Sequence, residues 1–132
     1  MTHYVGILDG SGKTWGVRVP DLPGVHGGGK TPEAAISDAI SAAREWAAHA
    51  VSKGVAIPRP RPMTAVMLSG EVEAGEATVM IPLLLDAGRT VRANVTFDAG
   101  LLEAIDDEAR QRGLTRAAFL ASAAREKIEE RR

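Results

Sequence analysis

The sequence contains no cysteine and few aromatic residues, namely two Trp, one Tyr and two Phe. Without cysteine, the chain can form neither a disulfide framework nor a thiolate metal site. It also has no run approaching the roughly 20 apolar residues that a membrane-spanning helix requires. Its N-terminus lacks the basic and apolar regions of a signal peptide. We therefore expect a cytoplasmic protein without a membrane anchor.

A large net charge is absent as well, because 16 basic residues nearly balance 17 acidic ones and leave a net charge of −1. Residues 1–88 contain seven Lys and Arg against nine Asp and Glu, whereas residues 89–132 contain nine against eight. Proteins that bind nucleic acid usually concentrate positive charge locally, so the total does not exclude DNA binding. The 132 residues suffice for one ordinary domain or for two small ones.

The beginning of the chain has the pattern of a β-hairpin followed by a helix. Residues 3–8 and 14–19 have strand composition, and the intervening Gly and Asp residues favour a tight turn. A Thr N-cap followed by Pro predicts a helix over residues 32–53, which Gly54 would end. The apolar stripe of this helix consists of Ile36, Ala39, Ile40, Ala43, Ala47, Ala50 and Val51.

The following segments complete an α+β domain, which we predict to span residues 1–86. Residues 57–62 hold three prolines, which exclude a helix or an inner strand and predict an extended connector. Residues 77–85 have the composition of a further strand, in which Pro82 requires an edge or end position. With a short strand before the helix, the predicted order of elements is β-β-β-α-β.

The last part of the chain, residues 88–132, has a different pattern. After a turn at 86–89, we expect a short strand at 90–97 and two helices at about 99–112 and 116–130, separated by Gly113. One strand and two short helices bury little surface, and units this small usually depend on disulfides, metals or oligomerisation. Because cysteine is absent, we expect the tail to form a homodimer or higher homo-oligomer.

The predicted strand at 90–97 alternates polar and apolar side chains. Arg92, Asn94 and Thr96 share one face, whereas Ala93, Val95 and Phe97 share the other. Two such strands paired antiparallel across a two-fold axis would form a ribbon whose apolar face lies on the helices. The polar face would enter the DNA major groove, where Arg suits guanine, Asn suits adenine and Thr suits either. The alternative is an exposed strand face that is polar without a function.

The two helices of the tail have well-defined starts. Asp98 is predicted to cap the first helix and Thr115 the second, and the free amides of the second helix, assisted by Arg116, suit a DNA phosphate. The predicted buried positions of the second helix are Phe119, Leu120, Ala123, Ala124 and Ile128. In strand length, helix spacing and the polar-basic opening of the second helix, residues 90–130 resemble the ribbon-helix-helix family, which includes the Arc and MetJ repressors. The resemblance implies dimeric binding to operator DNA.

A second motif lies between the predicted hairpin and the first helix. The sequence Val19-Pro20-Asp21-Leu22-Pro23-Gly24-Val25 is followed by a glycine-rich loop, and Gly54-x-x-Ile57-Pro58-x-Pro60 lies downstream. Over residues 4–85 this pattern resembles the HicB antitoxin family, although members of that family more often have Cys at position 25 and Gly-Asp at 29–30. The resemblance implies a partial RNase H-like domain that blocks a small ribonuclease toxin, HicA, and is joined to a DNA-binding module that regulates its own operon. We expect the bend around Pro20 and Leu22 to shape the toxin-facing surface.

Ligand binding has weaker support in the sequence. Gly24–Thr31 fits the G-x-x-x-x-G-K-[ST] pattern of a phosphate-binding loop literally. Such a loop follows a buried parallel strand, however, whereas the order predicted here is antiparallel. We therefore expect neither a nucleotide nor another cofactor. Trp15 and Trp46 are interpreted as core anchors between sheet and helix rather than as a stacking site for a ligand.

Catalysis and metal binding are also poorly supported. An RNase H-type active site needs several converging carboxylates, but Asp9, Asp21 and Glu33 fall in a turn, a bend and a helix start. The acidic run at 106–108 lies within a helix, where consecutive side chains point in different directions and cannot share one ion. We therefore predict that the protein is not an enzyme and holds no metal.

Together these patterns predict an antitoxin with two separable parts. The head, residues 1–86, would neutralise a HicA-like ribonuclease toxin, and the tail, residues 88–132, would dimerise and repress transcription from operator DNA. Two alternatives remain open. One is a stand-alone ribbon-helix-helix regulator without a toxin partner, and the other is a degenerate nucleic-acid-processing enzyme.

Overall fold

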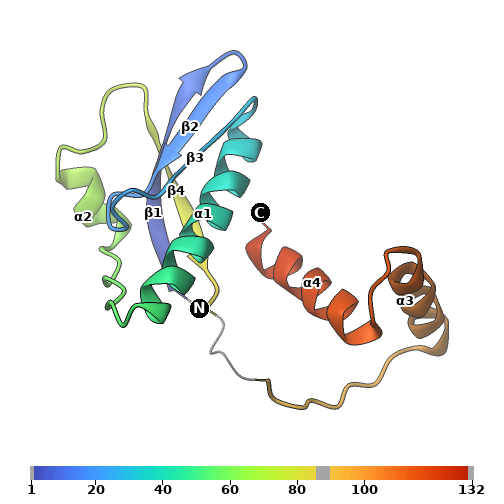
Figure 1. The fold of residues 1–132 in the computed structure, drawn as a ribbon. Coiled ribbons are helices and arrows are strands. Elements are labelled where there is room, and N and C mark those ends of the chain that lie inside the picture. Colours follow the sequence, from blue (N-terminus) through green and yellow to red (C-terminus); the bar gives the residue numbers. More distant parts are fainter. Residues whose placement is uncertain (1, 86–89, 131–132) are drawn as a thin grey trace. The chain divides into compact units, whose positions relative to one another are not determined.

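A computed structural model describes residues 2–85 and 90–130 of the chain. The chain divides into two compact units, Met1–Ala87 and Gly88–Arg132, which are described separately below (Figure 1). The turn predicted at 86–89 lies outside the described residues. Among the helices of the described part, none combines the length and apolar character needed to cross a membrane.

The first unit is built on a four-stranded antiparallel sheet (Figure 1). Its strands are β1 (Thr2–Ser11), β2 (Thr14–Arg18), β3 (His26–Gly29) and β4 (Ala77–Leu83), in the spatial order β3-β2-β1-β4. The predicted hairpin, the short third strand and the late strand are therefore confirmed, and so is the α+β class. Pro82 lies in the edge strand β4, where a missing N–H donor is tolerated.

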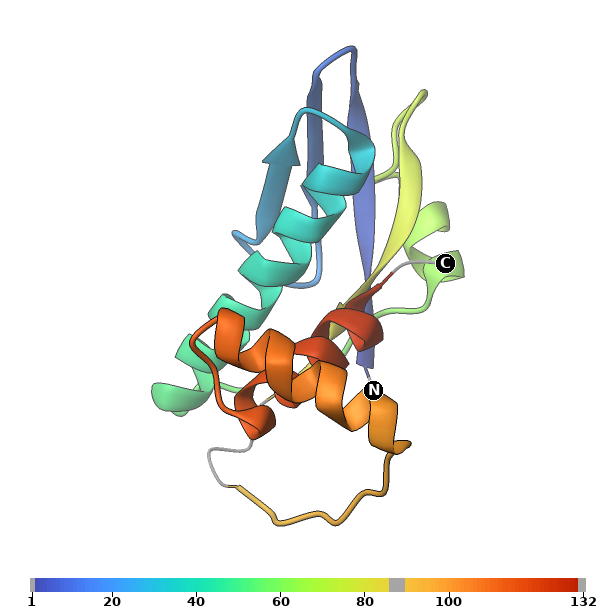
Figure 2. The same ribbon diagram turned by 90° about the vertical axis from the view of Figure 1, so that its right-hand side faces the viewer.

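One face of the sheet is covered by the long helix α1 (Pro32–Ser52) (Figure 2). The Thr31 hydroxyl accepts a hydrogen bond from the Ala34 amide at 3.1 Å, which confirms the predicted N-cap. All predicted stripe residues are buried except Val51, which lies in the last turn and is exposed. Gly54 follows the helix with φ +69°, a conformation that favours glycine at a helix end.

The glycines of β3 let this strand lie directly against α1. A Cβ atom at Gly27 would come within 2.3 Å of the Ala39 amide nitrogen and 2.6 Å of the Ala35 carbonyl oxygen. The amide of Gly28 already donates to the Asp38 carboxylate at 2.9 Å. The glycine run therefore serves close packing of strand against helix, which accounts for it without a phosphate-binding role.

The other face of the sheet carries a small second core. Val5 and Ile7 of β1 contact Val66 of a short helix, α2 (Met63–Leu68), and all three are fully buried. The connector at 57–62 forms neither helix nor inner strand, and the Tyr4 hydroxyl donates to the Pro58 carbonyl oxygen within it. The helix α2 was not predicted, because a six-residue helix with one buried side chain has no readable apolar period.

The second unit contains α3 (Ala99–Gln111) and α4 (Arg116–Glu129). Both predicted N-caps are confirmed, since Asp98 accepts from the Gly100 and Leu101 amides and Thr115 accepts from the Ala118 amide. The predicted strand at 90–97 is not formed in this single chain, because a strand needs a partner and the described part of this unit offers none.

The packing of α4 also differs from the prediction. Phe119, Leu120 and Ala123 are only half-buried, whereas Ala124 and Ile128 are exposed. In the described part of this unit, only Ile105 and Ala109 of α3 are buried, and α4 contributes no buried residue. The predicted buried positions of α4 are therefore not buried within the single chain.

The contact between β3 and α1 leads to a stability prediction. The variant Gly27→Ala should lower the free energy of unfolding of the first unit by about 1–3 kcal/mol, because its methyl group meets helix backbone that cannot move aside. Gly28→Ala is the matched control, since its Cβ would meet only the Trp15 carbonyl oxygen at 3.5 Å. Denaturant titrations followed by tryptophan fluorescence report this unit alone, since both Trp residues lie in it. Equal stability of the two variants would contradict this account.

Candidate functional site

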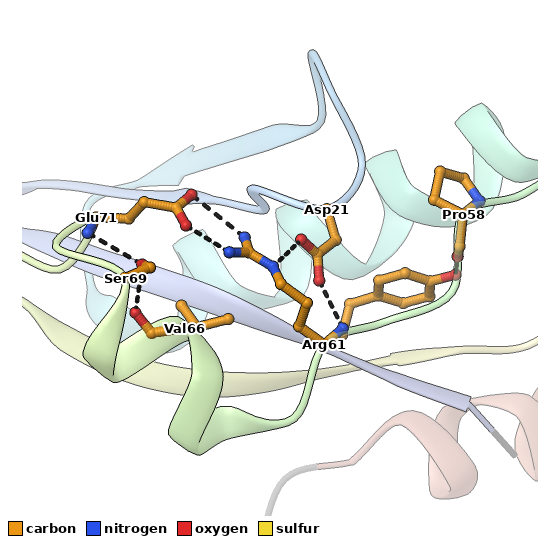
Figure 3. A network of polar contacts seen from close by, with 7 residues as sticks. Asp21, Pro58, Arg61, Val66, Ser69 and Glu71 are labelled. Carbon is orange, nitrogen blue, oxygen red and sulfur yellow. Dashed lines mark hydrogen bonds and ion pairs between the residues drawn. The ribbon is translucent and has the colours of Figure 1, made fainter.

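A network of ion pairs centred on Arg61 joins three segments of the first unit (Figure 3). The Nε atom and the backbone amide of Arg61 each donate to the Asp21 carboxylate at 2.7 Å. The Nη1 atom of Arg61 donates to Oε1 of Glu71 at 2.6 Å, and Nη2 donates to Oε2 at 3.3 Å. Since Arg61 lies just before α2 and Glu71 just after it, one guanidinium group clamps both ends of this helix onto the bend that contains Asp21.

The bend itself, residues 19–25, is a closed structural element. The Val19 amide donates to the Val25 carbonyl at 3.1 Å, and the Leu22 amide donates back to the Val19 carbonyl at 3.0 Å. The Leu22 side chain is fully buried, so any effect on a neighbouring surface comes from the shape of the bend and not from a direct contact of Leu22. Leu22 therefore anchors the bend from inside, and Asp21 of the same bend pairs with Arg61.

A second guanidinium group fastens the loop that follows α2. Arg18 pairs with both carboxylate oxygens of Glu76 at 2.7 Å and also donates to the Glu71 carbonyl oxygen at 2.8 Å. The Glu76 side chain is only 10% exposed. The hydrogen bonds from Arg18, followed by one from the Glu73 amide, lower the pKa of Glu76 to about 2.

Neither network could be found from a sequence motif. Arg18 and Glu76 are 58 positions apart, and Asp21 and Arg61 are 40 positions apart. The only local signal was the bend motif, which contains Asp21 but does not indicate its partner. The carboxylates named as catalytic alternatives do not form a metal site, because no group of three or more metal-ligating side chains occurs among the described residues.

The predicted base-contacting residues lie on the extended segment at 90–97. Arg92, Asn94 and Thr96 are all exposed. Val95 on the alternate face is also exposed, at 69% of its maximal area, whereas Phe97 is half-buried. The single chain therefore leaves both faces of this segment open to solvent over most of its length.

The predicted phosphate-contacting residues lie at the start of α4. Thr115 uses its hydroxyl to cap the helix, as described above. Arg116 makes a bidentate ion pair with Asp106 of α3, in which Nε and Nη2 of Arg116 each lie 2.9 Å from a carboxylate oxygen. This pair raises the pKa of Arg116 and lowers that of Asp106. The guanidinium group is thus held by a carboxylate in the chain rather than presented unpaired.

The acidic run at 106–108 is accounted for by three separate ion pairs. Asp106 pairs with Arg116, Asp107 with Arg110 and Glu108 with Arg112. The side chains diverge toward different arginines, as expected for consecutive residues of a helix. The run therefore does not form a cluster around one ion.

The depressed pKa of Glu76 gives a prediction with a definite sign. A carboxyl group with a lower pKa in the folded than in the unfolded state stabilises the fold above its ordinary value of 4.5 and loses that contribution as the pH falls toward about 2. Glu76→Gln should therefore be less stable than the natural protein at pH 7, and the difference should shrink steadily below pH 4.5. Denaturant titrations followed by tryptophan fluorescence at several pH values measure it.

The matched control is Glu45→Gln, at an exposed position of α1. This variant should show no comparable loss of stability at pH 7. A stability difference for Glu76→Gln that stays constant from pH 7 to pH 3 would contradict the proposed role of the Arg18 pair.

Comparisons with known proteins place this architecture in a family. Residues 4–124 match the family model described as HicB-like antitoxin of bacterial toxin–antitoxin system. The crystal structure of the antitoxin HicB of Burkholderia pseudomallei is 27% identical in sequence and superposes with a TM-score of 0.55. The match covers 100% of this chain and 100% of the HicB chain. The antitoxin HicB3 is 24% identical over 98% of this chain and 100% of its own, with a TM-score of 0.54.

A third structural match comes from a HicA3–HicB3 toxin–antitoxin complex. It is 16% identical over 64% of this chain and 99% of its own, with a TM-score of 0.50, and therefore indicates a shared fold. No curated protein sequence gives a significant match. Because the family model spans nearly the whole described chain, it covers both compact units. The chain therefore belongs to the HicB-like antitoxin family of bacterial toxin–antitoxin systems.

Proposed function

We propose that this antitoxin neutralises a HicA-like ribonuclease toxin through its first unit and represses its own operon through a dimeric ribbon-helix-helix unit at its C-terminal end. The observation that carries the proposal is the match of both units to the HicB-like family model. A fold shared with a chain of a HicA3–HicB3 complex supports a HicA-like toxin as the partner. In this role the protein acts in the cytoplasm by binding, not by catalysis.

The β-β-β-α-β order of the first unit, interrupted only by α2, supports its assignment as a partial RNase H-like domain. The domain boundary is proposed to fall near residue 87, with residues 1–86 binding toxin and residues 88–132 binding DNA. The division of the chain into two compact units supports this boundary.

Dimerisation of the tail is supported by the apolar surface that a single chain leaves uncovered. The exposed large apolar residues of this unit are Val91, Val95, Leu101, Leu114 and Ile128. A 45-residue unit with this much apolar exposure gains the missing burial most directly from a second copy. Pairing of two 90–97 segments would also supply the strand partner that the single chain lacks.

The proposed dimer gives the polar residues of the ribbon a defined task. With Ala93, Val95 and Phe97 turned onto the helices, Arg92, Asn94 and Thr96 of both copies face the major groove. The start of α4 at Thr115 would receive a backbone phosphate on its free amides. For Arg116 to assist there, the phosphate must replace the Asp106 carboxylate as its partner.

Toxin neutralisation is tested by co-expression with the small protein encoded by the neighbouring gene. The two proteins should purify as one complex, and the RNA-cleaving activity of the small protein should disappear on addition of this chain. A neighbouring protein with no ribonuclease activity, or one that does not bind the chain, would favour a regulator without a toxin partner.

The ribbon is tested by operator binding. Arg92→Ala and Asn94→Ala should each lower operator affinity by at least about tenfold, because a two-pronged base contact contributes roughly 1–3 kcal/mol and occurs twice per dimer. Affinity for a random duplex should change far less, and toxin binding should be unchanged. Full operator affinity in the double variant would exclude this ribbon.

The proposed phosphate contact is tested by substituting each residue of the Arg116–Asp106 ion pair. Arg116→Ala should weaken operator and random DNA alike and flatten the dependence of binding on salt concentration. Asp106→Asn, which releases Arg116 from its partner, should strengthen binding to both. Opposite shifts from these two substitutions distinguish a phosphate contact from a merely structural ion pair, whose loss from either side would weaken binding.

A further inference from the structure

The tip of α2 exposes apolar side chains that the fold does not use. Leu68, the last residue of the helix, is 87% exposed, and its neighbour Met67 is 57% exposed. Val66, by contrast, is fully buried and attaches the helix to β1. Two large apolar side chains exposed at one end of a helix offer surface that a partner can bury.

This tip is held in place by polar contacts on both sides. Arg61 clamps the two ends of α2 through Asp21 and Glu71, as Figure 3 shows. The Ser69 hydroxyl donates to the Val66 carbonyl oxygen at 2.6 Å and accepts from the Glu71 amide at 3.2 Å. A fixed apolar tip loses little conformational freedom on binding, which favours association.

The rim of the tip is negatively charged. The loop at 69–76 contains Glu71, Glu73 and Glu76 and no basic residue. Arg18 and Arg61 pair with Asp21, Glu71 and Glu76, so two cations face three carboxylates there, and Glu73 adds a further negative charge. Arg18 and Arg61 both point into the networks that hold the loop and are occupied there.

We infer that the tip of α2, Met67 and Leu68, together with the acidic loop at 69–76, binds the positively charged RNA-binding face of the ribonuclease toxin. The inference rests on the proposed function and assigns its toxin-binding surface. A ribonuclease must carry positive charge where it holds the polyanionic RNA backbone. An acidic rim would attract that face, and the apolar tip would be buried against it, so that antitoxin and RNA compete for the same site.

The test measures toxin affinity of full-length variants by titration calorimetry. Met67→Ser with Leu68→Ser should lower the affinity at least about tenfold, since buried apolar residues at the centre of an interface dominate its stability. The matched control is Val51→Ser with Val55→Ser, because these residues are similarly exposed at the end of α1 and beyond it. The control variant should bind toxin as the natural protein does.

The contribution of charge is tested separately with Glu73→Lys. The matched control is Glu45→Lys, at an exposed position of α1. Glu73→Lys should slow association and weaken the salt dependence of the association rate, whereas Glu45→Lys should change neither. Melting temperatures and operator affinity of all variants should stay unchanged, since none of the altered side chains is buried.

The outcomes separate the inference from the proposed function. If the natural protein does not bind the toxin at all, the proposed function fails. If it binds and the α2 and Glu73 variants bind equally well with normal melting temperatures, the proposed function stands and this surface assignment is wrong. A change of oligomeric state in the α2 variant, with toxin affinity unchanged, would instead assign the tip to a contact between copies and overturn the inference.

Discussion

The absence of a side chain at Gly27 fixes the distance between α1 and the sheet, and the rest of the first unit follows from that distance. The helix contributes mainly alanines to the contact, so its backbone approaches β3 as closely as β3 allows. Because β2 and β3 pair antiparallel, the chain between Arg18 and His26 must reverse its direction. The closed bend that results buries Leu22 and turns Asp21 toward the opposite face of the sheet. The bend next to the strand that packs on α1 therefore also carries the charged partner of Arg61.

The two faces of the sheet are stabilised in different ways. The α1 face has a continuous apolar core, whereas the α2 face has only a cluster around Val5, Ile7 and Val66. On that second face, Arg18 and Arg61 supply much of the order by pairing with carboxylates from the bend and from the loop after α2. Because ion pairs rather than a large apolar core hold this face in place, the face can be both rigid and rich in charged side chains. This combination suits recognition of a partner with opposite charge.

The elements that could be predicted from the sequence are those whose evidence is local. Thr31, Asp98 and Thr115 each cap a helix through an amide two or three residues away, and the hairpin strands are adjacent in the chain. The ion pairs of Arg18 and Arg61 join residues 40 or more positions apart and left no pattern to detect. The segment at 90–97 has the alternation of a strand, but alternation indicates only which faces differ and cannot provide a pairing partner.

The lack of buried residues in α4 has a consequence for how the antitoxin would respond to its own abundance. If the tail acquires its core only in a pair, then at low abundance the amount of folded pair grows with the square of the chain concentration. A twofold fall in the number of chains per cell would then lower the amount of folded pair about fourfold, and under the proposed function operator occupancy would fall with it. Toxin neutralisation by the separately folded first unit would decline only in proportion. Under the proposed function, the same shortage would restart synthesis of the antitoxin well before most of the toxin escaped inhibition.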